Sequence, residues 1–445
     1  MDVEERPTAK VTGARPPLAR PDARPATRGL SARVVGSVSA ISDAELDRVT
    51  GRASVFFDRR WLRLLDALDL APLVGGALTL RYVLVYEGEA LAAVCPFVLA
   101  DAGSIHYVYS FEKSFFTSWQ DDLARINPEM AGAARWLSLL ITGFRRLVTA
   151  AGVPTRRWIL SASPLSFRGA VAVAPLEEAA RRRVLGAALA RLEEVGRAED
   201  APIWFFRIPG EEAELREALA ERGFDEVLAL YDNVIEGVEG GLDGYLARFR
   251  RGPRGNIKRE MSRIRKAGVS FEVTRDPSGL EHELSALYEA TYSKYGPERF
   301  GHPPSFWGAL SRALGPHAEF ILARRGGTLV GFTLLLHKGD LWAYRLGKQE
   351  DAGDDGAFLY FSLAFYEPIR RAGELGARRL WLGPGGWGTK HHRGAMGYPL
   401  YSAFWFPSRV WRAALLPYLQ AFSWATHRQL EFSTQRSTNT RGEAP

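Results

Sequence analysis

A glycine-rich segment near the end of the chain carries its densest group of chemically active side chains. It reads GPGGWGTKHHRGAMG from Gly383 to Gly397 and follows an apolar strand pattern. Glycines at this density let backbone N–H groups approach a ligand closely. The cations Lys390 and Arg393 would be costly to bury unless they face an anion or a developing oxyanion. We therefore predict a functional loop, with Lys390 as a catalytic candidate and Trp387 and Arg393 as substrate-binding candidates.

The adjacent histidines of this loop, His391 and His392, raise the question of a metal site. Neighbouring residues project in different directions, and no Cys or Asp follows at ligand spacing, so we expect no metal ion. The chain has no Gly-x-Ser-x-Gly elbow, P-loop, HExxH or CxxC pattern. Their absence argues against a serine hydrolase, a P-loop NTPase and a zinc enzyme.

A second concentration of charge lies in the segment FRRGPRGNIKREMSRIRKAG, residues 249–268. On the helix that this segment predicts, Arg254, Lys258 and Arg265 fall near one face, while Ile257 and Ile264 mark the buried stripe. The basic face has two interpretations. It is either a solvated helix surface or a phosphate-binding edge, because Arg and Lys side chains hold diphosphates and RNA backbones.

Three further residues invite interpretation. Tyr344 and Arg345 end a predicted strand, where they either pack as an aromatic ring with a surface cation or line a cavity. We carry Tyr344 as a catalytic and Arg345 as a substrate-binding candidate. The single cysteine, Cys95, rules out an intramolecular disulfide and lies in an apolar strand, where a buried, inert thiol is expected.

The bulk composition is that of an ordinary globular protein. Of 445 residues, 46% are hydrophobic and 24% charged, and the formal net charge of +7 permits an anionic partner without requiring one. No apolar run reaches the length of a membrane span. Residues 1–35 are rich in Pro and Arg and lack the apolar core of a signal peptide, so we expect a disordered leader and a cytoplasmic location.

The order of predicted elements occurs twice, with Leu329 lying 238 residues after Leu91. Each copy reads as three strands separated by glycine turns, then an amphipathic helix (133–150 or 358–374). A strand opening on a Gly/Pro/Ser loop follows, RRWILSASPLSFRG in the first copy and RRLWLGPGGWGTKHHRG in the second. This spacing suits a duplicated domain, and the alternative is a pair of unrelated α+β domains. The fold class expected is α+β, in which each copy is a mixed central sheet flanked by helices.

The predicted boundaries follow from this duplication. The first copy covers residues 36–236, with its third strand at 104–111, and the linker reads EGVEGGLDG. The second copy covers 237–407 and holds the candidate residues. A C-terminal helix and tail occupy 408–445. In that helix Trp411, Leu415, Leu419, Phe422 and Trp424 have the spacing of a face that packs on the body.

These segments together resemble the Fem-type branch of the GNAT acyltransferase superfamily. The similarity is carried by RGNIKREMSRIRKAGVSFEV, LYEATYSKYG, ARRGGTLVGFTLLLHKGDLWAYRLG and WLGPGGWGTKHHRGAMG. It covers about Gly241 to Phe406, whereas the first copy resembles the family only in its order of elements. The resemblance implies tandem GNAT-like domains, of which the second is catalytic.

The resemblance also implies an activity: transfer of an acyl or aminoacyl group to an amine, without a metal or a tightly bound cofactor. The donor would be an aminoacyl-tRNA or an acyl thioester, and the acceptor a small-molecule amine in cell-wall or natural-product biosynthesis. The lysine of the family's loop maps onto Lys390, whose charge would stabilise the tetrahedral intermediate, and Tyr344 or a group of the substrate would relay a proton. No DNA partner is implied, and the protein would act as a monomer or homodimer.

Two alternatives remain open at this point. One is an acetyltransferase that uses acyl-coenzyme A, but GKQEDAGDDGAFLYF replaces the usual phosphate loop. Its Asp351, Asp354 and Asp355 would repel a pyrophosphate. The other is a non-catalytic binding module, which gains weight because no histidine or carboxylate can be assigned as general base.

Overall fold

A computed structural model shows one continuous mixed sheet covered by helices on both faces. The residues that it describes are 29–74, 76–101, 109–116, 142–144, 146–147, 150–151, 157–166, 168–292, 301–349 and 358–441. The predicted loop carboxylates Asp351, Asp354 and Asp355, and most of the predicted helix 133–150, lie outside these residues.

Each half of the chain contributes a matching series of strands. The first series is β1 (Leu30–Val35), β2 (Leu78–Glu87), β3 (Ala90–Asp101), β4 (Arg157–Ser161), β6 (Ile203–Pro209) and β7 (Asp225–Glu236), with a two-residue β5 (Ala172–Val173) beside β3. The second is β8 (Val269–Thr274), β9 (Ala318–Arg325), β10 (Thr328–Lys338), β11 (Asp340–Lys348), β12 (Arg379–Pro384) and β13 (Met396–Trp405). The tandem GNAT fold expected from the sequence is thus confirmed.

Strand pairing corrects how the two copies correspond. β4 is antiparallel to β3 and parallel to β6, just as β11 is antiparallel to β10 and parallel to β12. The counterpart of β11 is therefore β4, and not the strand predicted at 104–111. Residues 102–108 lie outside the described part of the chain, and helix α4 (Phe111–Phe116) follows. Residues 30–35, which the sequence placed in a disordered leader, instead form β1 and pair with β2 along its length.

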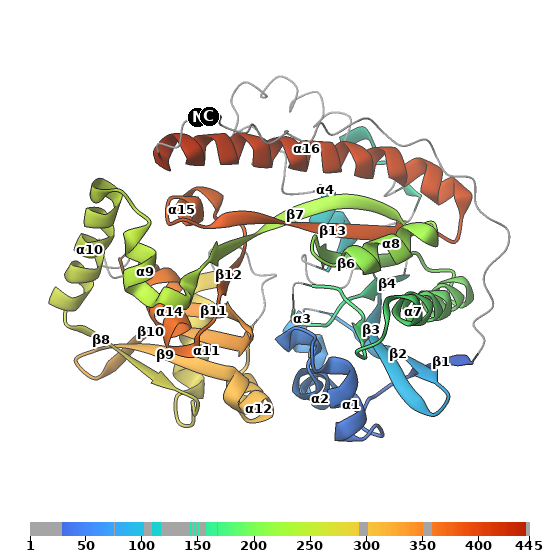
Figure 1. Ribbon diagram of the computed structural model, residues 1–445, viewed down its shortest axis with the longest axis horizontal. Helices are drawn as coiled ribbons and strands as arrows, with labels where there is room; N and C mark the ends of the chain where they lie inside the picture. The colour runs from blue at the N-terminus through green and yellow to red at the C-terminus, as the bar shows by residue number, and fades with distance from the viewer. Residues whose placement is uncertain are drawn as a thin grey trace, which may run out of the picture.

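The last strands of the two halves are interleaved. β13 lies between β6 and β7, and β7 lies between β13 and β12, so each half inserts its final strand beside the other's (Figure 1). Figure 1 shows the two long strands running side by side through the middle of the molecule. The predicted boundary at 236 falls at the end of β7 but does not divide the sheet. Separating the halves would break backbone hydrogen bonds.

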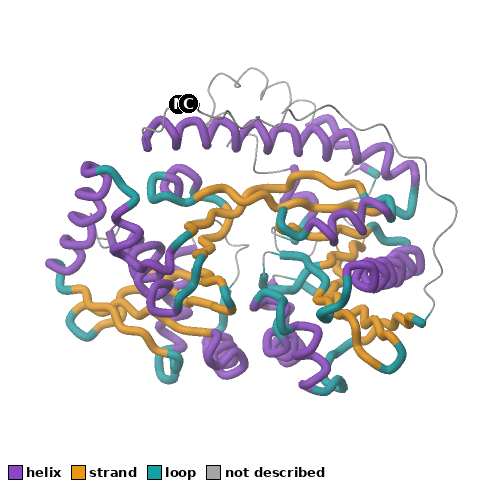
Figure 2. Tube along the Cα trace, in the orientation of Figure 1, coloured by secondary structure: helices purple, strands orange, loops and turns teal. Residues whose placement is uncertain are grey.

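Helices cover both faces of the sheet (Figure 2). One face carries α1 (Asp43–Thr50), α2 (Arg59–Ala67), α3 (Leu70–Val74), α11 (Glu281–Tyr292) and α12 (Pro304–Leu314), which share one core across both halves. The other face carries α7 (Glu178–Ala198) and α8 (Ala213–Glu221) on the first half, and α9 (Gly241–Ala247), α10 (Arg251–Lys266) and α14 (Glu367–Leu375) on the second. Successive strand residues such as Tyr82 and Val83 alternate between these cores. Cys95 is buried, and burial raises the pKa of its thiol to about 12.

Short helices interrupt some predicted segments. The predicted linker becomes a 3₁₀ turn, η4 (Val238–Gly240), and α9, while Pro253 in the first turn of α10 suits the break between the two helices. The helix after β11 contains a π-helical stretch, η7 (Ser362–Tyr366), whose Leu363 carbonyl accepts a bond of 2.7 Å from the Thr333 hydroxyl. Two further 3₁₀ turns are η1 (Val55–Phe57) and η6 (Gly315–His317).

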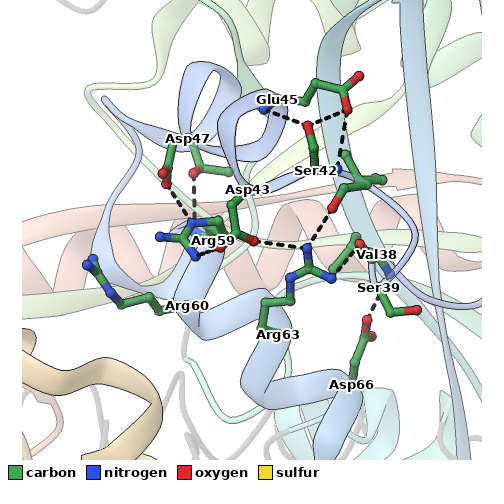
Figure 3. A network of polar contacts seen from close by, with 12 residues as sticks. Val38, Ser39, Ser42, Asp43, Glu45, Asp47, Arg59, Arg60, Arg63 and Asp66 are labelled. Atoms are coloured by element: carbon green, nitrogen blue, oxygen red, sulfur yellow. Dashed lines mark hydrogen bonds and ion pairs between the residues drawn. The ribbon is translucent and has the colours of Figure 1, made fainter.

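The polar side of the α1–α2 pair is fixed by a local network (Figure 3). Ser42 and Glu45 form a capping box at the start of α1. Arg59 of α2 binds Asp43 and Asp47 of α1, at 2.5 and 2.8 Å. With its polar side held in this way, α2 directs its apolar side, including the fully buried Trp61, toward the second half of the molecule.

Candidate active site

The parallel strands β11 and β12 pair over only two residues each. The register joins Leu341 to Leu380 and Trp342 to Trp381, and the two indole rings stack 4.8 Å apart. Beyond them β11 continues to Lys348 and β12 to Pro384 without pairing to one another. The carboxyl ends of two parallel strands therefore part at one place, which is where open α/β sheets bind ligands.

Tyr344 and Arg345 lie on β11 just beyond this last pair. Both are buried, the Tyr344 hydroxyl donates to the Leu165 carbonyl at 2.8 Å, and Arg345 Nε donates to His302 Nε2 at 3.0 Å. Burial raises the pKa of Tyr344, although Arg345 opposes this, and burial together with Arg345 holds the pKa of His302 well below its usual value. The site thus contains a neutral phenol and a neutral imidazole beside a permanent cation.

A buried ion pair from the first half supports the strand ends. Arg168 lies over the rings of Trp342 and Trp381, at 4.4 and 4.0 Å, and binds Asp232 at 3.1 Å. Both charged side chains are almost completely buried, at 5% and 3% exposure. The desolvation of two charges is offset by their mutual attraction and by the cation–π contacts. The stacked tryptophans are thereby locked against β7.

The glycine loop is attached to β7 at the next residue. Asn233 Nδ2 donates to the carbonyls of Gly383 and Gly385, at 2.8 and 3.2 Å. Gly383, Gly385 and Gly386 all have positive φ, a conformation that disfavours other residues. The sequence GPGG therefore forms a turn that only glycine accommodates easily, and the short helix α15 (Trp387–His391) begins directly after it.

Lys390 folds back from α15 onto this turn. Its side chain is 8% exposed, and Nζ donates to the carbonyls of Leu382 and Gly383, at 2.9 and 2.8 Å. Burial lowers the pKa of Lys390 to about 8, although nearby Asp232 favours the charged form. An ammonium group has three protons to donate, and the two carbonyls account for two of them. The lysine thus fixes the turn through two of its three protons.

The remaining predicted residues lie apart from this centre. Arg393 binds Glu260 of α10 at 3.1 Å and lies over the Phe361 ring, so it joins the loop to the outer helices of the second half. The side chain of Trp387 lies outside the described part of the structure. On α10, Lys258 and Arg265 are exposed and Arg254 is partly exposed. Because Glu260 belongs to the same helix, α10 borders the lysine loop.

Sequence reasoning missed the contribution of the first half. Arg168 lies in the Gly/Pro/Ser loop after β4, and Asp232 and Asn233 lie inside an apolar strand. The only sequence signal was an Asp-Asn pair interrupting EVLALYDNVI, where two polar residues at the centre of a strand require partners. Their partners are 64 and 150 residues away, so no local spacing could reveal them.

Among the residues that the structure describes, no three His, Cys, Asp or Glu side chains gather as metal ligands would. No helix in the described part of the chain is long and apolar enough to cross a membrane.

Several solved structures are similar to this chain. FemX matches 84% of this chain and 98% of its own, with a TM-score of 0.52 and 11% identity. A tandem GNAT protein of the clavulanic acid biosynthesis pathway matches over the same shares, with a TM-score of 0.41 and 11% identity. L-PGS from Bacillus licheniformis matches 59% of this chain and 82% of its own, with a TM-score of 0.42 and 13% identity. No curated protein matches in sequence.

The similarity to FemX shows that the two proteins share a fold. A FemAB-like family model, described as peptidoglycan biosynthesis/recognition, matches residues 181–439, more than half of the chain. The chain belongs to this FemAB-like family.

Proposed function

We propose that this protein transfers an acyl or aminoacyl group from an activated ester to an amine at the parted ends of β11 and β12. The observation that carries the proposal is the position of Lys390. Its ammonium is held at the carboxyl end of a parallel strand pair by the carbonyls of Leu382 and Gly383. A fixed cation in a water-poor site stabilises a developing oxyanion far more than a mobile cation in water.

The reaction has a simple course. The neutral amine attacks the carbonyl carbon of the donor, and the carbonyl oxygen becomes an oxyanion beside Lys390. As the intermediate collapses, the bond to the alkoxide or thiolate leaving group breaks and a new C–N bond remains. The amine loses one proton and the leaving group gains one. Tyr344 would relay this proton by releasing the Leu165 carbonyl, accepting one proton and passing on its own.

An aminoacyl-tRNA is the donor that we favour. The exposed cations of α10 lie on the helix whose Glu260 binds Arg393, three residues after Lys390. Phosphates held along this helix would place the end of a nucleic acid near the lysine loop. Such contacts position an RNA without reading its bases. The acceptor is an amine, in keeping with the biosynthetic description of the family.

The test is a screen for activity with the full-length protein. Charged tRNA and acyl-coenzyme A pools are each incubated with a panel of amines, and products are detected by mass spectrometry. Lys390→Met should lower kcat about a hundredfold or more, the scale of losing an oxyanion donor. Product from acyl-coenzyme A alone would replace the favoured donor, and no product from either pool would favour a binding module.

The matched control is Lys338→Met. Lys338 Nζ also donates to a backbone carbonyl, that of Thr50 at 2.8 Å, and binds Asp58, but it lies away from the strand ends. This variant should lose stability without losing turnover per folded molecule. An unchanged kcat in folded Lys390→Met would remove Lys390 from the mechanism.

A further inference from the structure

The long C-terminal helix α16 (Arg409–Arg441) has two unlike faces. Its inner face buries Leu415, Leu419 and Phe422, as the sequence predicts, and Tyr418 donates to the carbonyl of Phe115 in α4. Trp424 departs from that prediction, because it is 50% exposed. In Figure 1 the helix extends along one side of the molecule, parallel to its longest axis.

The outer face combines apolar and basic residues. Val410 is 77% exposed, which is the largest exposure of any large apolar side chain within the described residues. Ala413 and Pro417 continue the same face toward Trp424 at intervals of three to seven residues. The exposed cationic or polar residues beside them are Arg409, Gln420, His427 and Arg428. No Asp or Glu occurs between residues 409 and 430.

A shallow groove lies along the first turns of this face. It has a volume of about 460 Å³ and is lined by Arg409, Arg412, Ala413, Leu416, Pro417 and Gln420. Arg412 is anchored by Asp225 at 2.7 Å, so it forms a fixed edge rather than a mobile side chain. The groove therefore has an apolar floor and a basic edge.

We propose that the outer face of α16 is a peripheral docking surface for an anionic lipid bilayer. Exposed Val and Trp side chains next to Arg are the composition of helices that lie in a membrane interface. The helix is about 50 Å long at 1.5 Å per residue, and Val410, Ala413, Pro417 and Trp424 follow one side of it. The positive charge complements acidic headgroups, which attract each basic residue near the surface.

Other occupants fit this face less well. A second copy of the chain would bring two basic faces together, which costs free energy. An RNA would bind the arginines and stack on Trp424, but it offers no apolar partner for the highly exposed Val410. Only a bilayer interface satisfies the apolar stripe and its basic flank together.

The experiment is vesicle co-sedimentation of the full-length protein. Phosphatidylcholine vesicles are compared with and without phosphatidylglycerol, at low and high salt. We expect binding to the anionic vesicles alone, weakened by salt. Val410→Ser with Trp424→Gln should reduce partitioning at least tenfold. Arg409→Gln with Arg428→Gln should reduce it about fivefold per arginine. All four side chains are exposed, so the variants should keep the wild-type melting temperature.

Matched controls remove similar groups elsewhere. Leu147→Gln with Val273→Ser removes two exposed apolar side chains, and Arg182→Gln with Arg183→Gln removes two exposed cations, all of them off α16. These variants should bind like the wild type. The proposal is overturned by any of four results: no binding to anionic vesicles, equal losses in the controls, displacement of the vesicles by total tRNA, or a dimer that dissociates when Val410 and Trp424 are replaced.

Discussion

The two halves of the molecule differ at the carboxyl ends of their equivalent parallel strands. In the first half, β4 and β6 pair as far as Ser161 and Phe205, and the chain then folds back on itself. Gly169 fills the space beyond, where a Cβ atom would overlap the carbonyls of Phe206 and Ser161. In the second half, the equivalent ends of β11 and β12 carry Tyr344, Arg345 and the Lys390 loop. Backbone therefore fills the space at the strand ends of the first half, whereas candidate functional side chains lie at the strand ends of the second half.

The first half also contributes backbone and side-chain groups to the candidate site of the second half. Leu165 accepts the Tyr344 hydrogen bond, Arg168 stacks on the paired tryptophans, and Asp232 binds Arg168 from the interleaved strand β7. Leu165 and Arg207 adopt positive φ values of 64° and 50°, which are strained for residues other than glycine. The first half therefore acts as a support, and the second half carries the candidate site.

The largest expected effect comes from breaking this support. Arg168→Met should destabilise the protein by about 3–5 kcal/mol, because it leaves Asp232 buried without its counter-charge. Adding Asp232→Asn should recover part of the loss. The measurement is chemical unfolding of both variants. As the matched control, Arg191→Met breaks an exposed pair with Glu194 and should cost less than about 1 kcal/mol. Equal losses for Arg168→Met and Arg191→Met would show that the first half does not support the site.

Substitution of Gly169 tests whether backbone closes the strand ends of the first half. Gly169→Ala should destabilise by about 1–3 kcal/mol, because the added methyl group meets two backbone carbonyls that cannot turn aside. The control is Gly186→Ala in α7, where nothing lies within 4 Å and alanine favours the helix. Thermal unfolding should show opposite signs for the two variants. A neutral Gly169→Ala would mean that the first half can open as the second does.

The pH dependence of turnover tests the cation of the second half. Because the pKa of Lys390 is about 8, kcat should fall roughly tenfold per pH unit above that value as the ammonium loses its proton. Lys390→Arg keeps its charge and should move this decline to higher pH in a pH–rate profile. Identical profiles for wild type and Lys390→Arg would assign the decline to another group.

The lowered pKa of Lys390 also determines how the stability of the protein changes with pH. The folded-state pKa lies below the ordinary value of 10.5, so between about pH 8 and 10.5 the unfolded chain binds more protons than the folded one. The stability of the wild type relative to Lys390→Met should therefore rise with pH across this window.

The smallest expected effect concerns the outer surface of the second half. Replacing Arg254, Lys258 and Arg265 by Gln should flatten the salt dependence of tRNA binding by about 0.7–0.9 in log–log slope per lost phosphate contact. Filter binding of total tRNA across a salt series measures this. The charge-matched control replaces the exposed Arg52, Arg182 and Arg183 of the first half. Slopes that match between the two triple variants, or no binding at low salt, would favour a thioester donor.

Much of the framework could be predicted from the sequence. Strand alternation, glycine turns and helical periodicity are local, so they identified the strands of the second half and the buried side of α16. The GPGG turn followed by Lys390 marked the loop for the same reason: positive φ at consecutive glycines is a property of those residues themselves. The same motifs carried the resemblance to the Fem-type family.

Tertiary structure decided which residues these motifs meet. The correspondence of β4 with β11 depends on strand pairing, and the interleaving of β7 and β13 joins segments about 170 residues apart. The burial that lowers the pKa of Lys390, and the Asp232 carboxylate that opposes it, exist only after this assembly. Local propensity fixes where a strand begins and which way its side chains alternate. Which strand lies beside it is set by packing and hydrogen bonding across the whole sheet, and so the partners of the lysine loop were decided only by the fold.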